Sequence, residues 1–211
     1  MKMKTFHRLL LEKLLKQNSV LVKGKILDAG SGQRRYDHLF KGEIIACDLN
    51  PKPEIKVEKC DLCALPYQNE QFDSVLCLEV LEYLTIDTVK VALKEIKRVL
   101  RPGGLVLLSS PFFYKDHQDN LRLSAHYLAS LFNEIGFSDV YVSKFGNKFT
   151  AYYDMMRYGY FKAKYLKPFY LLELALAMLA IKLFCLENKQ DDFYTGIMIK
   201  ITKKNSECSA N

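Results

Sequence analysis

The chain lacks the features that mark several classes of protein. Its 211 residues contain no internal repeat and no low-complexity segment. The lysines are scattered, so no basic run resembles a nucleic-acid-binding arm. The lysine-rich start, residues 1–16, has leucines at helical spacing but no long apolar core or small-residue cleavage site, which predicts no signal peptide. We therefore expect one domain that is long enough to bury a substantial core.

The six cysteines do not form a recognisable metal-binding pattern. Cys60-x-x-Cys63 has no second pair and no histidine cluster to complete a zinc site, so no metal is expected. Cys47 and Cys77 lie in apolar, strand-like runs and are predicted to be buried free thiols. This cysteine usage favours a reducing, cytoplasmic location.

Positive charge exceeds negative charge, with a formal net charge of +7 and a pI of about 9.0. A basic surface permits nucleic acid, anionic lipid or acidic small molecules as partners. Many basic proteins bind none of these, and composition alone leaves that alternative open. The hydrophobic share of 49% and the charged share of 26% are ordinary for a globular protein.

Short apolar runs alternate with helical patterns along the chain. Strands are expected at residues 24–29, 43–48, 55–59, 72–79, 104–110, 139–145 and 193–202. Helices are expected at residues 5–17, 34–40 and 124–135. A further helix, capped by Thr85 or Asp87, is expected to have an apolar face of Val89, Leu93, Ile96, Val99 and Leu100 and to end at Arg101-Pro-Gly-Gly104. Strands alternating with helices predict a parallel sheet covered on both faces, and the clearer polar–apolar alternation of the last two strands predicts an antiparallel edge. Residues 204–211 are polar and are predicted to be a disordered tail.

The first apolar run ends in a glycine turn. Residues 26–32 read Ile-Leu-Asp-Ala-Gly-Ser-Gly, and Gly30 and Gly32 carry no Cβ, so the chain can turn sharply and a ligand can touch the main chain. Asp48 follows Asp28 by 48 − 28 = 20 positions, one strand later, and can accept hydrogen bonds from ribose hydroxyls. These residues indicate the front half of a nucleoside-binding α/β site.

Six short motifs, in order, resemble a known family. They are Ile26-Leu-Asp-Ala-Gly-Ser-Gly32, Ala46-Cys-Asp48, Cys60-Asp-Leu62, Gln71-Phe-Asp-Ser-Val75, Leu78-Glu-Val-Leu-Glu-Tyr83 and Arg101-Pro-Gly-Gly104. Residues 24–145 and the final strand at 193–203 resemble the class I S-adenosylmethionine-dependent methyltransferases, especially the type 11 group. Position 35 is Arg35, where a dehydrogenase fingerprint has glycine. The resemblance implies a single Rossmann-like domain with a mostly parallel seven-stranded sheet, helices on both faces and S-adenosylmethionine as cofactor.

The resemblance also implies roles for individual residues. Gly30, Ser31 and Gly32 would line the amino-acid part of the cofactor, and Asp28 would orient that loop and approach the cofactor ammonium through water. Asp48 would hold the ribose hydroxyls, with Leu49 against the adenine. The implied set is completed by Asp61 and Leu62 at the adenine edge and by Glu79 at the methionine end.

The segment after the fifth strand is the predicted acceptor site. It keeps the His117, Asp119 and Arg122 of a His…Asp-x-x-Arg loop that it resembles in methyltransferases found beside glycan-assembly enzymes. The unperturbed pKa of histidine suits a general base, so His117 is the candidate base, oriented by Asp119 or Asp116. The alternative is that His117 and Arg122 only stabilise the loop and that Asp119 serves only as a capping residue.

Residues 146–192 form an aromatic and hydrophobic helical insertion before the last strand. Phe169–Leu186 is nearly all apolar, but the following strand must return to the same sheet, so a membrane span is not expected. We expect residues 165–186 to contact a membrane surface or a second copy of the chain. A lid over the substrate and a cap on the domain itself are the alternatives.

Together these observations predict methyl transfer from S-adenosylmethionine to a small or lipid-linked acceptor, in particular a hydroxyl of a sugar or glycan precursor. The predicted location is cytoplasmic, with peripheral attachment to a membrane as an alternative. An RNA methyltransferase ranks lower because the sequence has no RNA-binding module. A non-catalytic cofactor-binding scaffold, docked through its insertion, is the alternative from a different class.

Overall fold

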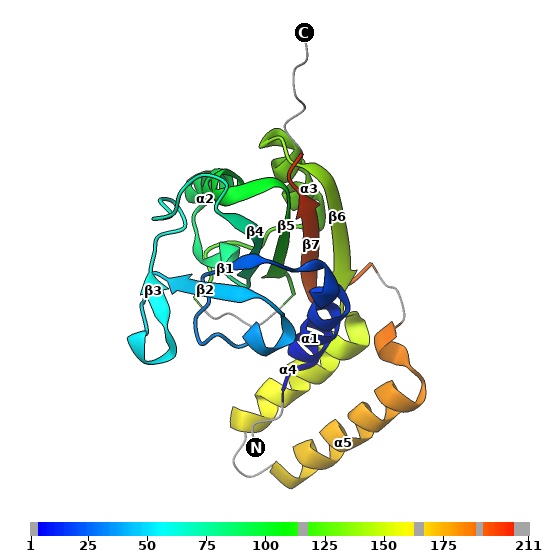
Figure 1. Cartoon of the computed structure of the whole chain (residues 1–211). Coiled ribbons are helices and arrows are strands. Elements are labelled where there is room, and N and C mark those ends of the chain that lie inside the picture. Colours follow the sequence, from blue (N-terminus) through cyan, green and yellow to red (C-terminus); the bar gives the residue numbers. More distant parts are fainter. Residues whose placement is uncertain (1–3, 114–117, 163–166, 189–191, 205–211) are drawn as a thin grey trace.

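A computed structural model describes residues 4–113, 118–162, 167–188 and 192–204. Within these residues, seven strands form one sheet in the order β3-β2-β1-β4-β5-β7-β6 (Figure 1). The strands are β1 (Lys25–Ala29), β2 (Glu43–Asp48), β3 (Val57–Lys59), β4 (Phe72–Leu78), β5 (Leu100–Pro111), β6 (Ser138–Phe145) and β7 (Gly196–Thr202). The α-helices are α1 (Phe6–Asn18), α2 (Ile86–Val99), α3 (Ala125–Glu134), α4 (Lys148–Lys162) and α5 (Lys167–Leu183). This is the predicted Rossmann-like, mostly parallel α/β fold.

Strand direction changes at one end of the sheet, as predicted. Strands β1 to β5 pair in parallel, whereas β7 runs antiparallel to both β5 and β6. The last two strands therefore form the predicted antiparallel edge, in which β7 lies between β5 and β6 and β6 is outermost. Most of β7 is buried, as expected for a strand with a neighbour on each side.

Alternate side chains of the central strands point to two separate cores. In β4, Val75 and Cys77 pack in the cluster that includes α2 and α3, whereas Leu76 packs in the cluster that includes α1. Val75, Leu76 and Cys77 are all fully buried. Helices therefore cover both faces of the sheet, as the sequence predicts.

Helix α2 confirms the predicted cap and apolar face. Thr85 accepts from the Thr88 backbone N–H, and Thr88 accepts in return from the Thr85 N–H. Its buried face contains the predicted Val89, Leu93, Ile96 and Val99, together with Ala92. Leu100, also predicted for this face, is buried as the first residue of β5.

Two boundaries differ from the prediction. Strand β5 begins directly after α2, so Arg101-Pro-Gly-Gly104 lies inside a strand, where the pairing shifts from Phe72–Leu100 to Ser74–Leu105. The expected helix at 34–40 is one 3-10 turn at Asp37–Leu39. Proline and glycine occur both at helix ends and at strand bulges. These residue types therefore do not show which of the two features a segment forms.

The insertion is a helical hairpin beside α1 (Figure 1). Phe6 of α1, Tyr153 of α4, and Leu174 and Ile181 of α5 form a small third core. The opposite face of α5 exposes Leu172, Leu176, Leu179 and Leu183, with exposed fractions from 56% to 67%. In the described part of the chain, no helix is both long and apolar enough to cross a membrane.

Candidate functional site

A cavity of about 620 Å³ opens at the carboxyl ends of β1, β2 and β4, where open α/β sheets bind ligands. All nine predicted cofactor residues line it: Asp28, Gly30, Ser31, Gly32, Asp48, Leu49, Asp61, Leu62 and Glu79. The sheet order separates two sides of this cavity. We call the residues that follow β2 and β3 the β2–β3 side, and those gathered around the end of β4 the β4 side.

The glycine loop forms a tight turn after β1. The N–H groups of Gly30 and Ser31 both donate to the Cys47 carbonyl, at 2.8 and 3.0 Å. Gly30 has a φ of +79°, and a Cβ there would lie 2.6 Å from a methyl carbon of Val80. A Cβ at Gly32 would meet no atom within 4 Å. The loop therefore needs glycine at position 30 and leaves open space beside its backbone at Gly32.

Asp48 joins the glycine loop to the end of β2. One carboxylate oxygen accepts from the Gly32 N–H at 3.0 Å and the other from the Asn50 N–H at 2.9 Å. A carboxylate oxygen has two lone pairs, so each oxygen can accept one further hydrogen bond. Asp48 is thus fixed in place and still able to bind a diol.

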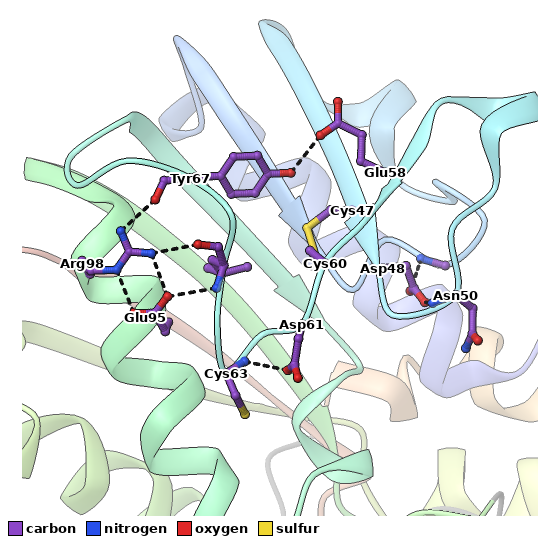
Figure 2. The surroundings of a disulfide bond; sticks show 12 residues. Cys47, Asp48, Asn50, Glu58, Cys60, Asp61, Cys63, Tyr67, Glu95 and Arg98 are labelled. Carbon is purple, nitrogen blue, oxygen red and sulfur yellow. Dashed lines mark hydrogen bonds and ion pairs between the residues drawn. A yellow bond between two sulfur atoms is a disulfide. The ribbon is translucent and has the colours of Figure 1, made fainter.

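Asp61 lies at the matching position after β3, and its carboxylate accepts from the Cys63 N–H at 2.8 Å. A disulfide between Cys47 and Cys60 links the residues that immediately precede Asp48 and Asp61 (Figure 2). The prediction of a free thiol is wrong for Cys47, whereas Cys77 is a buried free cysteine. The pairing of β2 with β3 brings Cys47 and Cys60 together, and sequence alone does not show which strands are neighbours. The disulfide also weakens the argument for a reducing compartment.

Asp28 is buried beneath the glycine loop. Burial, followed by the negative charge of nearby Asp37, raises the pKa of Asp28 to about 8. Asp37 also forms an ion pair with Arg34 at 2.7 Å. At neutral pH the Asp28 carboxyl therefore holds a proton, which a cation placed in the cavity would help to displace.

The β4 side contains a pair that sequence reasoning missed. Glu79, in a left-handed conformation with a φ of +59°, accepts from the Ser109 hydroxyl at 2.8 Å. Its other carboxylate oxygen lies 2.9 Å from Nε2 of His7, which lines the cavity from α1 and is almost fully buried. Because 72 residues separate His7 from Glu79, no local motif signals this pair.

The insertion holds His7 in place. The carboxylate of Asp154 in α4 accepts from the backbone N–H groups of Phe6 and His7, at 2.7 and 3.0 Å. The rings of Phe6 and Tyr153 meet edge to face, with centroids 4.8 Å apart. These contacts fix the first turn of α1 against α4 and so orient His7 toward the cavity.

Arg8, Arg35 and Tyr36 also line the cavity and are outside the nine predicted residues. Burial and the charge of Glu79 raise the pKa of Tyr36, while Arg35 and Arg8 act in the opposite direction. Both guanidinium groups therefore lie close enough to Tyr36 to affect its ionisation. Arg35 is the residue that stands where a dehydrogenase fingerprint has glycine, directly after the glycine turn.

The predicted acceptor loop is only partly described. His117 lies outside the described residues. Asp119 and Arg122 form an ion pair, and Arg122 also donates to the Phe112 carbonyl at 3.1 Å. Neither is among the residues that line the cavity. The loop is attached to the β4 side through the Glu82 carbonyl, which accepts from Asn120 and Leu121 at 2.7 and 3.0 Å.

The cavity residues fit S-adenosylmethionine. Carboxylates at the ends of β2 and β3 suit ribose hydroxyls and an exocyclic amine, and Leu49 and Leu62 supply apolar surface for a base. The open backbone at Gly32 allows close approach of a ligand, while Asp28 and Glu79 suit an ammonium group. The fold and this donor set are those expected of S-adenosylmethionine-dependent methyltransferases.

Comparison with known proteins supports this class. Residues 27–108 match the family described as "Methyltransferase domain", which implies S-adenosylmethionine as cofactor. The chain is similar to a solved S-adenosylmethionine-dependent methyltransferase from Archaeoglobus fulgidus, with a TM-score of 0.63 at 14% identity over 92% of this chain and 93% of that one. It is also similar to Haemonchus contortus phosphoethanolamine N-methyltransferase 2 in complex with S-adenosylmethionine, with a TM-score of 0.55 at 16% identity over 87% of this chain and 49% of that one.

The sequence relatives match a shorter segment. A tRNA (carboxymethyluridine(34)-5-O)-methyltransferase from Arabidopsis thaliana is 36% identical over 94 residues, which are 40% of this chain and 23% of that protein. An uncharacterised protein from Haemophilus influenzae is 30% identical over 100 residues, 41% of this chain and 40% of its own length. The chain thus spans well under half the length of these relatives, and their likeness is confined to part of the domain.

Proposed function

We propose that the protein transfers the methyl group of S-adenosylmethionine to an oxygen atom of a small or lipid-linked polar acceptor, with a sugar hydroxyl as the acceptor to test first. The single observation that carries the choice of oxygen is the pair of His7 Nε2 and Glu79 Oε2, 2.9 Å apart at the cavity wall. A hydroxyl must lose a proton as it is methylated, and an imidazole beside a carboxylate can take that proton up.

The residues of this chain would have distinct roles in the reaction. S-adenosylmethionine supplies an electrophilic methyl group on a sulfonium. Asp48 would hold the ribose and Asp61 the adenine edge, while Asp28 and Glu79 would face the ammonium. The His7–Glu79 pair would accept the hydroxyl proton as the oxygen–carbon bond forms. His117 stays the other candidate base, with Asp119 and Arg122 bracing its loop.

The tRNA methyltransferase likeness favours a second candidate, an RNA acceptor. The name of that enzyme also denotes methylation of an oxygen, which agrees with the proposed nucleophile. The similarity covers 23% of that protein, however, and no described element of this chain adds an RNA-binding module. A small or lipid-linked acceptor is therefore the first choice.

The test begins with calorimetry of S-adenosylhomocysteine binding and continues with transfer of labelled methyl into fractionated cell extract. We expect saturable binding, and label in a fraction that survives ribonuclease. His7→Gln should lower transfer by about 10²–10⁴ if His7 belongs to the base, with little change in binding. Ribonuclease-sensitive label would support the RNA acceptor, and binding without label in any fraction would support a non-catalytic scaffold.

We also propose that the exposed leucine face of α5 contacts a membrane surface, which would bring the site to a lipid-linked acceptor. The support is the stripe of Leu172, Leu176, Leu179 and Leu183, which recurs at helical spacing on the side of α5 opposite the third core. Exposed apolar patches of this kind mark interaction sites. The competing occupant is a second copy of the chain.

Sedimentation with vesicles of anionic lipid tests this contact. The protein should sediment with the vesicles, and Leu172→Ser/Leu176→Ser/Leu179→Ser should abolish sedimentation while the protein remains folded. Ile86→Ser/Val91→Ser, which removes exposed apolar side chains from α2, is the matched control and should sediment normally. A wild-type protein that ignores vesicles but forms a dimer in analytical ultracentrifugation would instead assign the face to a homodimer.

A further inference from the structure

Two arginine side chains line the cavity near its β4 side, and the proposed function gives them no role. Arg8 projects from α1, one residue after His7, and Arg35 follows the glycine loop; both line the cavity. Their common neighbour is Tyr36, whose ionisation responds to both guanidinium groups and to Glu79. The two cations therefore flank the place where the acceptor would meet the His7–Glu79 pair.

These two arginines differ from four of the arginines elsewhere on the domain. Four others form ion pairs with carboxylates: Arg34 with Asp37, Arg98 with Glu95, Arg101 with Asp73 and Arg122 with Asp119. Within the described residues, neither Arg8 nor Arg35 forms such a pair. A guanidinium at a cavity wall without a carboxylate partner is free to bind an anionic ligand.

The charges on this side of the cavity favour an anion. Glu79 supplies one negative charge against the two guanidinium groups. The buried Glu82 carboxyl has a pKa raised to about 9, so it does not supply a full negative charge at neutral pH, and Asp28 would face the cofactor ammonium. A bound sulfonium would add a further positive charge. An acceptor with a negative group would complement this surface, and a neutral acceptor would not.

We propose that Arg8 and Arg35 form a subsite for a carboxylate or phosphate group of the acceptor, placed so that the acceptor's hydroxyl faces His7 and Glu79. This inference rests on the proposed methyl transfer and adds the substrate class, an anionic hydroxyl compound. Two guanidinium groups can bind the oxygens of one such group with several hydrogen bonds. The cofactor carries one carboxylate of its own, so the test must distinguish that source of negative charge from the acceptor.

The probe is phenyl phosphate, titrated into protein saturated with S-adenosylhomocysteine and followed by calorimetry. We expect saturable binding, with an affinity at least about 10-fold lower in Arg8→Gln and in Arg35→Gln, the effect of losing one charge-assisted hydrogen bond. Lys94→Gln removes the same charge from an exposed position on α2 and should change the affinity by less than about twofold. Benzyl alcohol, the neutral probe, should bind to wild type and to both arginine variants with the same affinity.

Separate measurements identify each way in which the proposal can fail. Equal phenyl phosphate affinity in wild type and both arginine variants would overturn it. A loss of S-adenosylhomocysteine affinity in these variants, with unchanged affinity for 5′-methylthioadenosine, which lacks the amino-acid part, would assign the arginines to the cofactor carboxylate and also overturn it. Absence of S-adenosylhomocysteine binding in wild type would reject the proposed function itself, whereas normal cofactor binding without phenyl phosphate binding rejects this inference alone.

Discussion

The two sides of the cavity are built in different ways. The β2–β3 side and the adjoining glycine loop come from one short stretch of chain. The glycine loop, Asp48 and Asp61 all lie within residues 28–61 and are fixed mainly by backbone hydrogen bonds. The β4 side combines α1, the end of β4, β5 and the inserted helix α4, and side chains hold it together. A short stretch can be recognised from a motif, whereas a set of distant segments can be recognised only after folding.

This contrast has a functional counterpart. The β2–β3 side offers the groups that suit a nucleoside, which every enzyme of this class must bind. The β4 side offers the groups that would decide which acceptor reacts. We therefore expect substitutions on the β2–β3 side to change cofactor affinity, and those on the β4 side to change stability of α1 or choice of acceptor.

The largest expected effect is on the disulfide of the β2–β3 side. Cys47→Ser/Cys60→Ser should lower the free energy of unfolding by about 3 kcal/mol in the loop-closure account, since the bridge closes a short loop with a sequence separation of 13. Chemical denaturation measures this, and calorimetry should show weaker S-adenosylhomocysteine binding. Cys185→Ser, at an exposed free cysteine, is the control. Unchanged stability and affinity would show that the bridge has no part in holding Asp48 and Asp61.

Removing the Asp48 carboxylate should weaken the cofactor complex without unfolding the protein. Charge-assisted hydrogen bonds contribute about 1.5–3 kcal/mol, so Asp48→Ala should lower S-adenosylhomocysteine affinity roughly 10–150-fold. Asp87→Ala, an exposed carboxylate in the first turn of α2, should leave that affinity unchanged. Equal affinities of Asp48→Ala and wild type in calorimetry would reject the ribose assignment.

On the β4 side, Asp154→Ala should lower the stability of the protein rather than its affinity for the cofactor. Asp154→Ala leaves the Phe6 and His7 N–H groups without their acceptor, so the free energy of unfolding should fall by about 1–3 kcal/mol. Thermal unfolding should shift by about 2–4 °C per kcal/mol for a domain of this size. Glu173→Ala removes an exposed insertion carboxylate that binds Tyr152, and should have a much smaller effect. A large loss of cofactor affinity in Asp154→Ala would contradict the division between the two sides.

The last expected effect is a pH dependence of stability that comes from Asp28, beneath the glycine loop. Its folded pKa, about 8, lies above the ordinary value of 3.8, so between these pH values the folded state binds more protons than the unfolded state. Asp28 therefore makes the ligand-free protein less stable as pH rises from about 4 to 8. Thermal unfolding should show that Asp28→Asn reduces this decline. A pH profile identical to that of wild type would place the titration elsewhere.

The fold was largely predictable because its signals are local. The apolar runs of β1, β2 and β4, the Thr85 cap and the apolar face of α2 depend on neighbours along the chain. The nine predicted cofactor residues share one cavity because parallel strands end at the same edge of a sheet. Their roles in binding stay predictions until affinity is measured.

The missed residues share one physical cause. His7 appears in the sequence as part of an amphipathic helix, and nothing near it indicates that Glu79 will lie 2.9 Å away. Likewise, Cys47 and Cys60 become partners through the pairing of β2 with β3, and Asp154 reaches α1 from within the insertion.

Sequence by itself determined the class of fold, the glycine loop and the acidic residues at successive strand ends, since these depend on periodicity and on turn residues read within a few positions. Tertiary structure alone decided the position of β7 inside the sheet, the disulfide, the packing of the insertion on α1 and the set of His7, Arg8, Arg35 and Glu79 around the cavity. Contacts between residues far apart in the chain depend on how whole elements pack, and that packing is a property of the complete domain.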